Sequence, residues 1–322
     1  FTQNVTAGNA PLAVAFTDAS TGNVTAWAWD FGDSQTSTDQ SPTYTYAAPG
    51  TYTVTLNASN PYGYDLSTQT NLITVLTPPA AAFTANVTGG NAPLAVQFTD
   101  TSTGNVTAWS WLFGDGQTST LQNPAHTYAA AGTYTVTLNA SNPYGHDLST
   151  RTNLITVLTL PAAAFSANAT VIPVGAAVQF TDASTGDITG WSWTFGDGGT
   201  STEQSPSHTY ATAGLQTVSL TVSNAYGSDT ETKAAYIDVG HPPVASFTAN
   251  VTGGNAPLTV QFTDTSTGNV TAWSWDFGDG TTSTEQNPTH TYAVAGTYTV
   301  TLNASNAYGE DTETKTDYIT VL

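Results

Sequence analysis

Asparagine side chains in the triplet Asn-x-Ser/Thr are the most frequent candidates for chemistry in this chain, because this triplet accepts N-linked sugars. Most of them recur at equivalent places in segments that repeat every 82 residues. Alternation along the chain places Asn57 and Asn139 on an outward face. The alternative is that abundant Ser and Thr create such triplets by chance. We expect N-linked glycans, and the candidate sites are Asn4, Asn23, Asn57, Asn86, Asn105, Asn139, Asn168, Asn250, Asn269 and Asn303.

Aspartates that recur between segments are candidates for calcium, which takes six to eight oxygen ligands including several carboxylates. In the two middle segments Leu112 and Thr194 replace one of these carboxylates, which argues against a metal site shared by all segments. Capping of turns therefore explains the aspartates better than metal binding. Calcium stays an option, no other metal or cofactor is expected, and the calcium candidates are Asp18, Asp30, Asp264 and Asp276.

Three histidines, His126, His208 and His290, each stand two residues before a tyrosine, and Tyr44 takes their place in the first segment. A catalytic histidine would not be exchanged for tyrosine in one copy. Packing at the edge of a core, with a hydrogen bond to a loop, is the better explanation. The chain has no cysteine, and it contains no Gly-x-Ser-x-Gly, zinc or phosphate-loop motif. We expect no catalytic residue and no enzyme activity.

Tyrosines outside the alternating core pattern could bind a partner through their rings. An aromatic ring can stack on a sugar or on a neighbouring subunit. The candidates are Tyr64, Tyr236 and Tyr318. Ordinary packing at a domain junction is the alternative that we favour.

The elements that must position these residues are strands. Residues 51–57 alternate, with Tyr52, Val54 and Leu56 on one side and Thr and Asn on the other. Residues 94–99 and 109–113 alternate in the same way, and no stretch has a helical period. Such runs, separated by Gly, Pro, Asn and Asp, predict an all-β chain of antiparallel two-sheet sandwiches.

The repeat divides the chain into four units that begin at Phe1, Phe83, Phe165 and Phe247. A unit of this length suits a small domain with its own core. We expect domains at 1–76, 83–158, 165–239 and 247–322, of which the third is divergent. Short Pro-containing linkers join them and should be extended and semi-rigid.

Each unit contains a hairpin segment such as residues 275–280, Trp-Asp-Phe-Gly-Asp-Gly. His-Thr-Tyr at 290–292 and Gly-Thr-Tyr-Thr-Val at 296–300 follow it. This order resembles the PKD (polycystic kidney disease) domain and covers nearly the whole chain. The resemblance implies four tandem immunoglobulin-like sandwiches of a cell-surface or secreted protein. It implies a role as spacer, in adhesion, or in contacting proteins and carbohydrates, and the composition is most similar to archaeal surface-layer and filament proteins.

Composition narrows the function further. Three basic residues against 23 acidic ones give a net charge of −20, which disfavours nucleic acid and anionic membrane surfaces as partners. Only 8% of residues are charged, so Thr, Ser, Asn and sugars must keep the surface wet. No apolar run is long enough to span a membrane. The missing initiator Met and signal peptide indicate a processed or excised part of a longer protein.

Together these features predict an extracellular structural or adhesive protein. We expect a glycosylated rod that builds a cell-surface filament or surface layer and contacts copies of itself or other surface proteins and glycans. The alternative is a carbohydrate- or protein-binding array appended to a secreted enzyme. In the third segment Asp187 and Thr221 replace two Asn of the triplets. We expect this bare face to contact a neighbouring domain or subunit.

Overall fold

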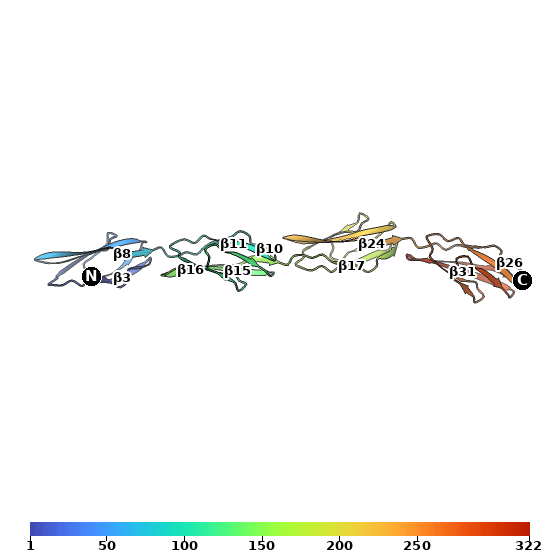
Figure 1. The fold of residues 1–322 in the computed structure, drawn as a ribbon, viewed down its shortest axis with the longest axis horizontal. Helices are drawn as coiled ribbons and strands as arrows, with labels where there is room; N and C mark the ends of the chain where they lie inside the picture. The colour runs from blue at the N-terminus through green and yellow to red at the C-terminus, as the bar shows by residue number, and fades with distance from the viewer. The chain divides into compact units, whose positions relative to one another are not determined.

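The computed structural model describes residues 1–322. Residues 1–159 and 160–322 form two compact units, which are described separately as the N-terminal and C-terminal halves. Every regular element is a β-strand, and each half contains two domains built from paired sheets (Figure 1). The prediction of an all-β chain of four two-sheet sandwiches is confirmed.

The N-terminal half holds domains 1 and 2. Domain 1 comprises strands β1 to β8, at Thr2–Gln3, Ala7–Asn9, Leu12–Thr17, Ala26–Asp30, Thr36–Ser37, Thr43–Tyr46, Gly50–Asn60 and Gly63–Leu76. Domain 2 comprises β9 to β16, at Phe83–Ala85, Gly89–Asn91, Leu94–Asp100, Ala108–Leu112, Thr118–Ser119, Ala125–Tyr128, Gly132–Asn142 and Gly145–Leu158. The sheet orders are β1-β3-β6 with β2-β8-β7-β4-β5, and β14-β11-β9 with β10-β16-β15-β12-β13.

The C-terminal half holds domains 3 and 4. Domain 3 comprises β17 to β24, at Phe165–Ala167, Val171–Pro173, Ala177–Asp182, Gly190–Thr194, Thr200–Ser201, Ser207–Thr209, Gly214–Asn224 and Gly227–Gly240. Domain 4 comprises β25 to β32, at Phe247–Ala249, Gly253–Gly254, Leu258–Asp264, Ala272–Asp276, Thr282–Ser283, Thr289–Tyr292, Gly296–Asn306 and Gly309–Val321. The sheet orders are β17-β19-β22 with β18-β24-β23-β20-β21, and β25-β27-β30 with β26-β32-β31-β28-β29.

One strand pair in each domain departs from the expected antiparallel arrangement. The short second strand of each domain runs parallel to the last strand, as β2 does along β8. The chain crosses from one sheet to the other between the first and second strands, and this crossing sets the direction of the second strand. Alternation shows which face of a strand is buried, but it carries no information about its direction.

The alternating pattern sorts side chains between core and surface as predicted. Along β7, Val54 and Leu56 are buried. On the opposite face the hydroxyl oxygens of Thr55 and Thr68 lie 3.0 Å apart across β7 and β8. Burying one such aliphatic side chain contributes about 2 kcal/mol, so each domain gains stability from its own interior.

Each domain has its own core around one fully buried tryptophan. The Trp29 indole donates to the Asp39 carbonyl at 2.9 Å, so burial leaves no unpaired donor. Gly32 follows in the same hairpin with φ of 85°, and a Cβ there would lie 2.4 Å from the Thr53 carbonyl oxygen. Glycine is therefore required where the hairpin crosses the neighbouring strand.

Candidate functional site

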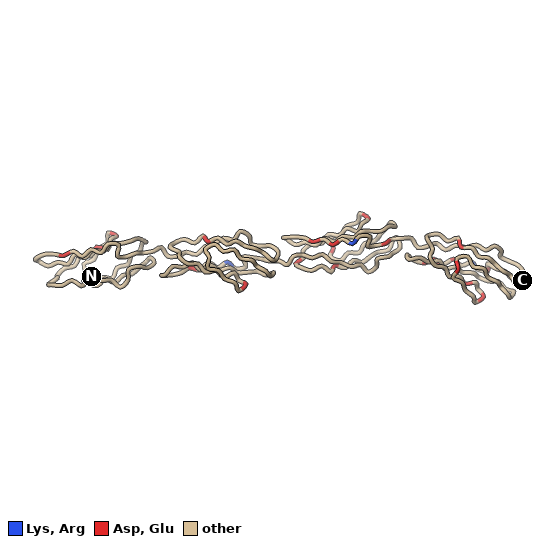
Figure 2. Tube along the Cα trace, viewed as in Figure 1, with Lys and Arg blue, Asp and Glu red and all other residues tan.

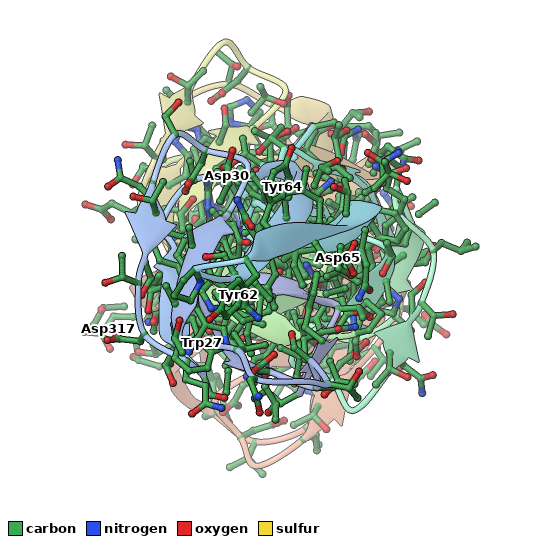
Figure 3. The ribbon with its side chains drawn as sticks, turned by 90° about the vertical axis from the view of Figure 1, so that its left-hand side faces the viewer. Trp27, Asp30, Tyr62, Tyr64, Asp65 and Asp317 are labelled. Carbon is green, nitrogen blue, oxygen red and sulfur yellow. The ribbon has the colours of Figure 1, made fainter.

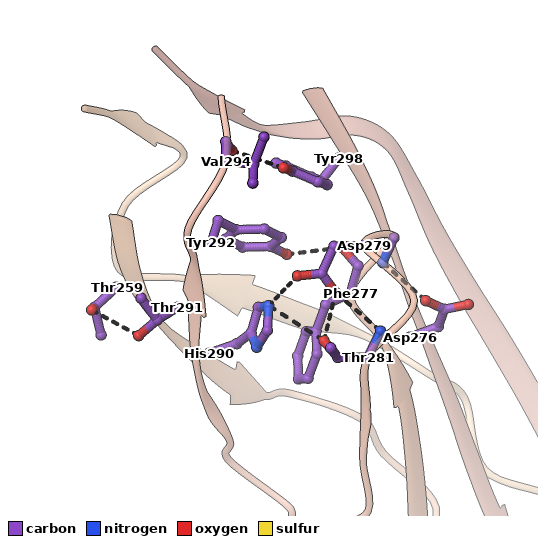
Figure 4. Close-up of polar contacts among 11 residues, drawn as sticks. Thr259, Asp276, Phe277, Asp279, Thr281, His290, Thr291, Tyr292, Val294 and Tyr298 are labelled. Carbon is purple, nitrogen blue, oxygen red and sulfur yellow. Dashed lines mark hydrogen bonds and ion pairs between the residues drawn. The ribbon is translucent and has the colours of Figure 1, made fainter. Parts of the chain in front are cut away.

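A hydrogen-bonded histidine–aspartate pair, called the corner below, is the arrangement in the chain that most resembles a catalytic site. In domain 4 (Figure 4), His290 Nε2 lies 2.7 Å from Asp279 Oδ2. The imidazole stacks on the Phe277 ring at a centroid distance of 4.3 Å and an interplanar angle of 1°. The Tyr292 hydroxyl donates to the Phe277 carbonyl at 3.0 Å. The hairpin containing Asp279 is therefore fastened to the strand containing His290.

The same corner recurs in the other domains. His126 and His208 pair with Asp115 and Asp197 at 2.7 and 2.8 Å. In domain 1, Tyr44 donates to Asp33 at 2.7 Å and stacks on Phe31 at 4.1 Å. Tyrosine thus makes both contacts of the histidine, which is the behaviour of a packing residue and not of a proton-transfer group.

Hydrogen bonding favours the ionised form of the corner aspartates of domains 2, 3 and 4, Asp115, Asp197 and Asp279. Partial burial acts to raise the pKa of Asp197, but the hydrogen bonds from His208 and the Gly199 amide outweigh it and lower the pKa. In domain 1, burial together with the Asp33 carboxylate raises the pKa of Tyr44 to about 12. A depression of about 450 Å³ beside the corner of domain 2 is lined by Asp115, His126 and Tyr134 among others, without a serine or cysteine.

The calcium candidates lie in two separate arrangements. Asp18 accepts hydrogen bonds from the Ser20 amide at 2.9 Å, the Trp27 indole at 2.7 Å and the Gln40 side chain at 3.3 Å. Asp264 is engaged in the same way by Ser266, Trp273 and Gln286. N–H donors therefore occupy both oxygens of each carboxylate.

Asp30 and Asp276 cap the following hairpin, where each accepts the amide of the glycine two residues on. The structure contains no group of three or more His, Cys, Asp or Glu side chains that could hold a metal ion. Calcium binding at these aspartates stays a prediction, and the geometry offers no converging carboxylates for it.

The asparagine triplets fall into sets with different surroundings. Asn4, Asn86, Asn168 and Asn250 are exposed. In each, the side-chain oxygen accepts a backbone amide from the third strand of the domain, for example Ala15 N to Asn4 Oδ1 at 2.8 Å. This bond orients the side-chain nitrogen, the atom that would carry a sugar, without using it. Asn23, Asn105 and Asn269 are also exposed, in loops.

The third set of asparagines lies on the outward face that alternation predicts but is less exposed than the other two sets. Asn57 and Asn139 lie in the middle of long strands and are only half-buried, and their Oδ1 atoms have no hydrogen-bond partner. Asn303 is half-buried as well and donates to Glu310 at 3.1 Å. Alternation along the strand places these side chains on the outward face of the sheet. There the neighbouring strands on both sides cover them in part. Their amides are poorly placed for modification.

All three basic side chains make contacts inside their own domains. Arg151, Lys233 and Lys315 stand over the rings of Phe83, Phe165 and Phe247 at 5.0, 4.5 and 4.6 Å. Both lysines also donate to the carbonyl of the phenylalanine that they cover. No cation is left to form a patch for phosphate groups. The structure also has no helix that could cross a membrane.

The tyrosine candidates separate into exposed and packed residues. Tyr64 is 71% exposed and Tyr62 98% exposed at one end of domain 1 (Figure 3). Tyr236 and Tyr318 instead pack edge-on against Phe165 and Phe247 at 5.7 and 5.6 Å. Their hydroxyls accept the amides of Ala167 and Ala249. Packing, the alternative that we favoured, therefore describes these two, although they pack against the cores of domains 3 and 4 and not at a domain junction.

A linker groove that the sequence did not indicate is the best-developed contact surface of the domains. In domain 2, residues 102–105 and Asp147 form it and hold linker residues 77–82. Ala80 and Thr103 exchange backbone hydrogen bonds at 3.0 Å. The Ala81 amide donates to Asp147 at 2.8 Å, and Thr77 N donates to Asn105 Oδ1 at 2.8 Å.

The same groove recurs in the C-terminal half. Ala162 forms an isolated antiparallel β-bridge with Thr185, and Val244 forms one with Thr267. The amides of Ala163 and Ala245 donate to Asp229 and Asp311, both at 2.8 Å. The recurrence of this aspartate at the repeat spacing was the available signal in the sequence, but its partner lies 66 residues away.

Comparison with known families decides the identity of these domains. A model of the PKD domain matches residues 1–75, 77–157, 160–239 and 240–321. The chain belongs to the PKD domain family. In the last three matches the PKD range begins within or just before the linker, and in the structure that linker hydrogen-bonds to the domain that follows it.

PKD domains of named proteins are similar to parts of this chain. Collagenase ColA of Bacillus cereus is 48% identical over 54 residues, 17% of this chain and 6% of that protein. Polycystin-1 of Homo sapiens is 31% identical over 196 residues, 58% of this chain and 4% of that protein. The metalloprotease precursor PrtV of Vibrio cholerae is 44% identical over 78 residues, 23% of this chain and 8% of that protein. The chain thus spans less than a tenth of each of these relatives.

Two solved structures are similar to parts of this chain. The PKD1 domain of Vibrio cholerae PrtV is 41% identical, with a TM-score of 0.22 over 24% of this chain and 95% of that one. The I-band fragment I67-I69 of titin is 15% identical, with a TM-score of 0.48 over 76% of this chain and 99% of that one.

Proposed function

We propose that this PKD array is a non-catalytic spacer of an extracellular protein, stiffened by linkers that dock onto the domain that follows them. The observation that carries the proposal is the linker groove. A linker that bonds to its domain through backbone groups cannot rotate freely, unlike a solvated chain of the same length.

Contacts between domains within each half support the same role. In the N-terminal half the side chains of Asn9 and Asn142 exchange two hydrogen bonds, at 3.1 and 2.9 Å. In the C-terminal half the Tyr308 hydroxyl donates to Asp238 at 3.0 Å. A Cβ on Gly240 would lie 2.3 Å from the Tyr308 ring, so glycine leaves the space that this ring occupies. These contacts restrain the angle between neighbouring domains.

An extracellular location and N-linked glycans fit the surface. With 8% charged residues and no cysteine, the exterior relies on hydroxyl and amide groups for its hydration. Seven of the ten candidate asparagines are exposed. We place the glycans on these seven.

Stiffness can be measured by the distance distribution between two spin labels, one on domain 1 and one on domain 2. We expect a narrow distribution for the unaltered chain. Replacing Pro78 and Pro79 by Gly together with Asp147→Ala should broaden it, whereas the control Asp39→Ala should not. An unaltered chain as broad as the linker variant would exclude the spacer role.

Assembly into a filament or surface layer is the finer form of this proposal, with copies of the chain or other surface proteins and glycans as partners. The bare face of domain 3, where Asp187 and Thr221 replace asparagines, would be the contact. Electron microscopy of the native cell surface tests it. Dispersed material without lattice or fibre would contradict the assembly, though not the spacer.

A second candidate is an array that holds a secreted enzyme on its substrate. The similarity to parts of collagenase ColA and of the metalloprotease precursor PrtV, over 54 and 78 residues, favours it. Co-sedimentation of the chain with insoluble collagen, chitin and cellulose tests this function. Retention on one of them, and its loss after Tyr62→Ala and Tyr64→Ala together, would support it over the spacer alone.

A further inference from the structure

A cavity of about 390 Å³ lies at the junction of domains 3 and 4, within the C-terminal half. The start of β23 and the end of β24 line it on the side of domain 3. Loop residues 268–269 and the turn between β31 and β32 line it on the side of domain 4. Small-ligand sites typically have volumes of about 300–1,000 Å³ and often lie between domains, so this cavity has the size and place of one.

Hydrogen bonds hold the domain 4 side of this cavity in place. Asn306 Nδ2 donates to the carbonyls of His241 and Gly268 at 2.9 and 2.7 Å. Asn306 Oδ1 accepts the Tyr308 amide at 2.8 Å. The Tyr308 hydroxyl donates to Asp238 Oδ1 at 3.0 Å. The second oxygen of this carboxylate, Oδ2, has no hydrogen bond and can accept one from a hydroxyl group in the cavity.

Asn269 lines the cavity and is one of the candidate glycan sites. Its counterpart in domain 2, Asn105, is tied to the linker. The Asn105 amide donates to the Thr77 carbonyl at 3.0 Å, and its Oδ1 accepts the Thr77 amide at 2.8 Å. Asn269 is exposed, makes neither bond, and has a left-handed backbone with φ of 53°. Both atoms of its side-chain amide are therefore free.

A third bond of the loop has moved as well. In domain 2, Asn142 Nδ2 donates to the Asn105 carbonyl at 3.1 Å. In domain 4 the corresponding Asn306 donates to the Gly268 carbonyl, one residue earlier in the loop. Asn269 therefore lacks all three bonds that fix its counterpart, which leaves it free to carry a group into the cavity.

An apolar side chain lies at the same cavity. Leu215 lines it and is 64% exposed, whereas the other three domains have threonine at this position, Thr51, Thr133 and Thr297. The C–H groups of a sugar ring can pack on Leu215 and on the Tyr308 ring, which removes apolar surface from water. Leucine here thus favours a ligand with one apolar face and several hydroxyl groups.

We propose that Asn269 carries an N-linked glycan whose first sugar lies in this cavity, with its ring against Leu215 and Tyr308 and one hydroxyl on Asp238. Residues 269–271, Asn-Val-Thr, provide the acceptor triplet. Tethering gives the sugar a high effective concentration, so weak contacts suffice. The sugar contacts both domains and restrains the angle between them. This role for the glycan rests on the proposed glycosylated surface and specifies one position on it.

The attachment joins Asn269 Nδ2 to the anomeric carbon of an activated donor of the sugar-diphosphate class. The new C–N bond replaces the anomeric C–O bond, and the diphosphate leaves with the electron pair of that bond. The amide nitrogen gives up one proton to solvent, and nothing is oxidised or reduced.

The test uses the absence of cysteine in this chain, since Asn269→Cys then provides a single thiol. An iodoacetamide derivative of N-acetylglucosamine attaches one sugar to that thiol. The accessibility of the Leu215 methyl groups to a soluble paramagnetic probe, measured by NMR, should fall about twofold or more, because the tether holds the sugar beside them. Nuclear Overhauser contacts should appear between the acetyl methyl group of the sugar and the Leu215 and Tyr308 side chains.

Two matched variants distinguish docking in the cavity from attachment alone. The same sugar on Asn250→Cys, at an exposed position of domain 4 outside the cavity, should leave Leu215 unchanged. Leu215→Thr, which introduces the residue of the other three domains, should remove the contact between the Tyr308 ring and the sugar attached through Asn269→Cys. Equal accessibility of Leu215 with the sugar at either position would overturn the proposal.

Glycopeptide mass spectrometry of the protein from its native cells gives an arm that needs no variant. We expect sugar on Asn269. A bare Asn269 beside occupied Asn4, Asn86, Asn168 and Asn250 would overturn this site and leave the glycosylated surface in place. The spacer role is tested separately by the distance distribution between domains 1 and 2, which does not involve this junction.

Discussion

At the scale of single residues, histidine and aspartate side chains, which are often catalytic in proteins, hold parts of the fold together in this chain. His290 closes a hairpin onto a strand through Asp279 and Phe277, and Asp264 ties a loop to the Trp273 indole. A hydrogen-bonded imidazole that tyrosine replaces in domain 1 needs only a flat ring and one polar atom. The stacking and hydrogen bonding of such side chains therefore contribute to the stability of the domain.

Replacing His290 tests this interpretation. We expect His290→Tyr to change the stability of domain 4 by less than about 0.5 kcal/mol, because Tyr44 makes the same contacts in domain 1. His290→Ala should cost about 1–2 kcal/mol through the lost stacking and hydrogen bond. Hydrogen exchange of the β28–β30 segments reports both. A tyrosine variant as damaged as the alanine variant would show that the imidazole has a further role.

Stability should depend on pH through the loop aspartates. Partial burial acts to raise the pKa of Asp264, but hydrogen bonds from Ser266, Gln286 and Trp273 lower it below 3.8. The ionised form is favoured in the folded state, so its stabilisation is complete above pH 3.8 and is lost as the pH falls through the folded-state pKa. Asp264→Asn should lower the Tm at neutral pH and flatten its fall in acid.

Asp317→Asn is the matched control, since Asn71 and Asn153 occupy the same position with the same φ of 53°. Its Tm profile from about pH 6 to pH 2 should follow that of the unaltered chain. An Asp264→Asn profile parallel to the unaltered one would remove this carboxylate from the account of acid unfolding.

At the scale of elements, the linker is the least conventional part of the array. Residues 77–82 look like a spacer by composition, yet they make bridge, amide and carboxylate contacts with domain 2. A linker held in this way behaves as an additional short strand of the domain that follows it. Thr77, the first residue after β8, is already bonded to Asn105, so no undocked residue separates this strand from the docked linker.

Substitution of two glycines can distinguish the stability due to linker docking from the cost of backbone strain. Gly104 and Gly116 have nearly equal φ, 87° and 88°, but only Gly104 lies against the linker, with Pro78 O 2.1 Å from its Cβ position. Gly116→Ala should cost about 1–2 kcal/mol from left-handed strain alone. Gly104→Ala should cost more and should accelerate exchange at the Ala80 and Ala81 amides. Unchanged exchange there would show that the linker is not held by the groove.

At the scale of the whole molecule, the surface is acidic, weakly charged and rich in hydroxyl groups. Acidic residues are spread over every domain (Figure 2). The three basic side chains lie over aromatic rings. Solubility must then come from net repulsion, polar uncharged side chains and any attached sugar. This combination suits a passive exterior better than a binding surface for polyanions.

Glycan occupancy should follow exposure and not the triplet alone. In protein purified from its native cells, glycopeptide mass spectrometry should find sugar at Asn4, Asn86, Asn168 and Asn250 before any at Asn57, Asn139 and Asn303. The first set has exposed, unused side-chain nitrogens, whereas the second is half-buried in strands. Full occupancy of the second set would mean that modification precedes folding of these strands.

The sequence alone determined the strand content, the core residues and the PKD resemblance, because alternation and turn residues act over a few neighbouring positions. Tertiary structure decided the features that join distant positions. The linker groove links Ala81 to Asp147 across 66 residues, and Tyr236 is packed although its local sequence leaves its exposure open. Half-burial of Asn57 came from strands paired on both sides. Such contacts depend on how strands assemble, which no local pattern encodes.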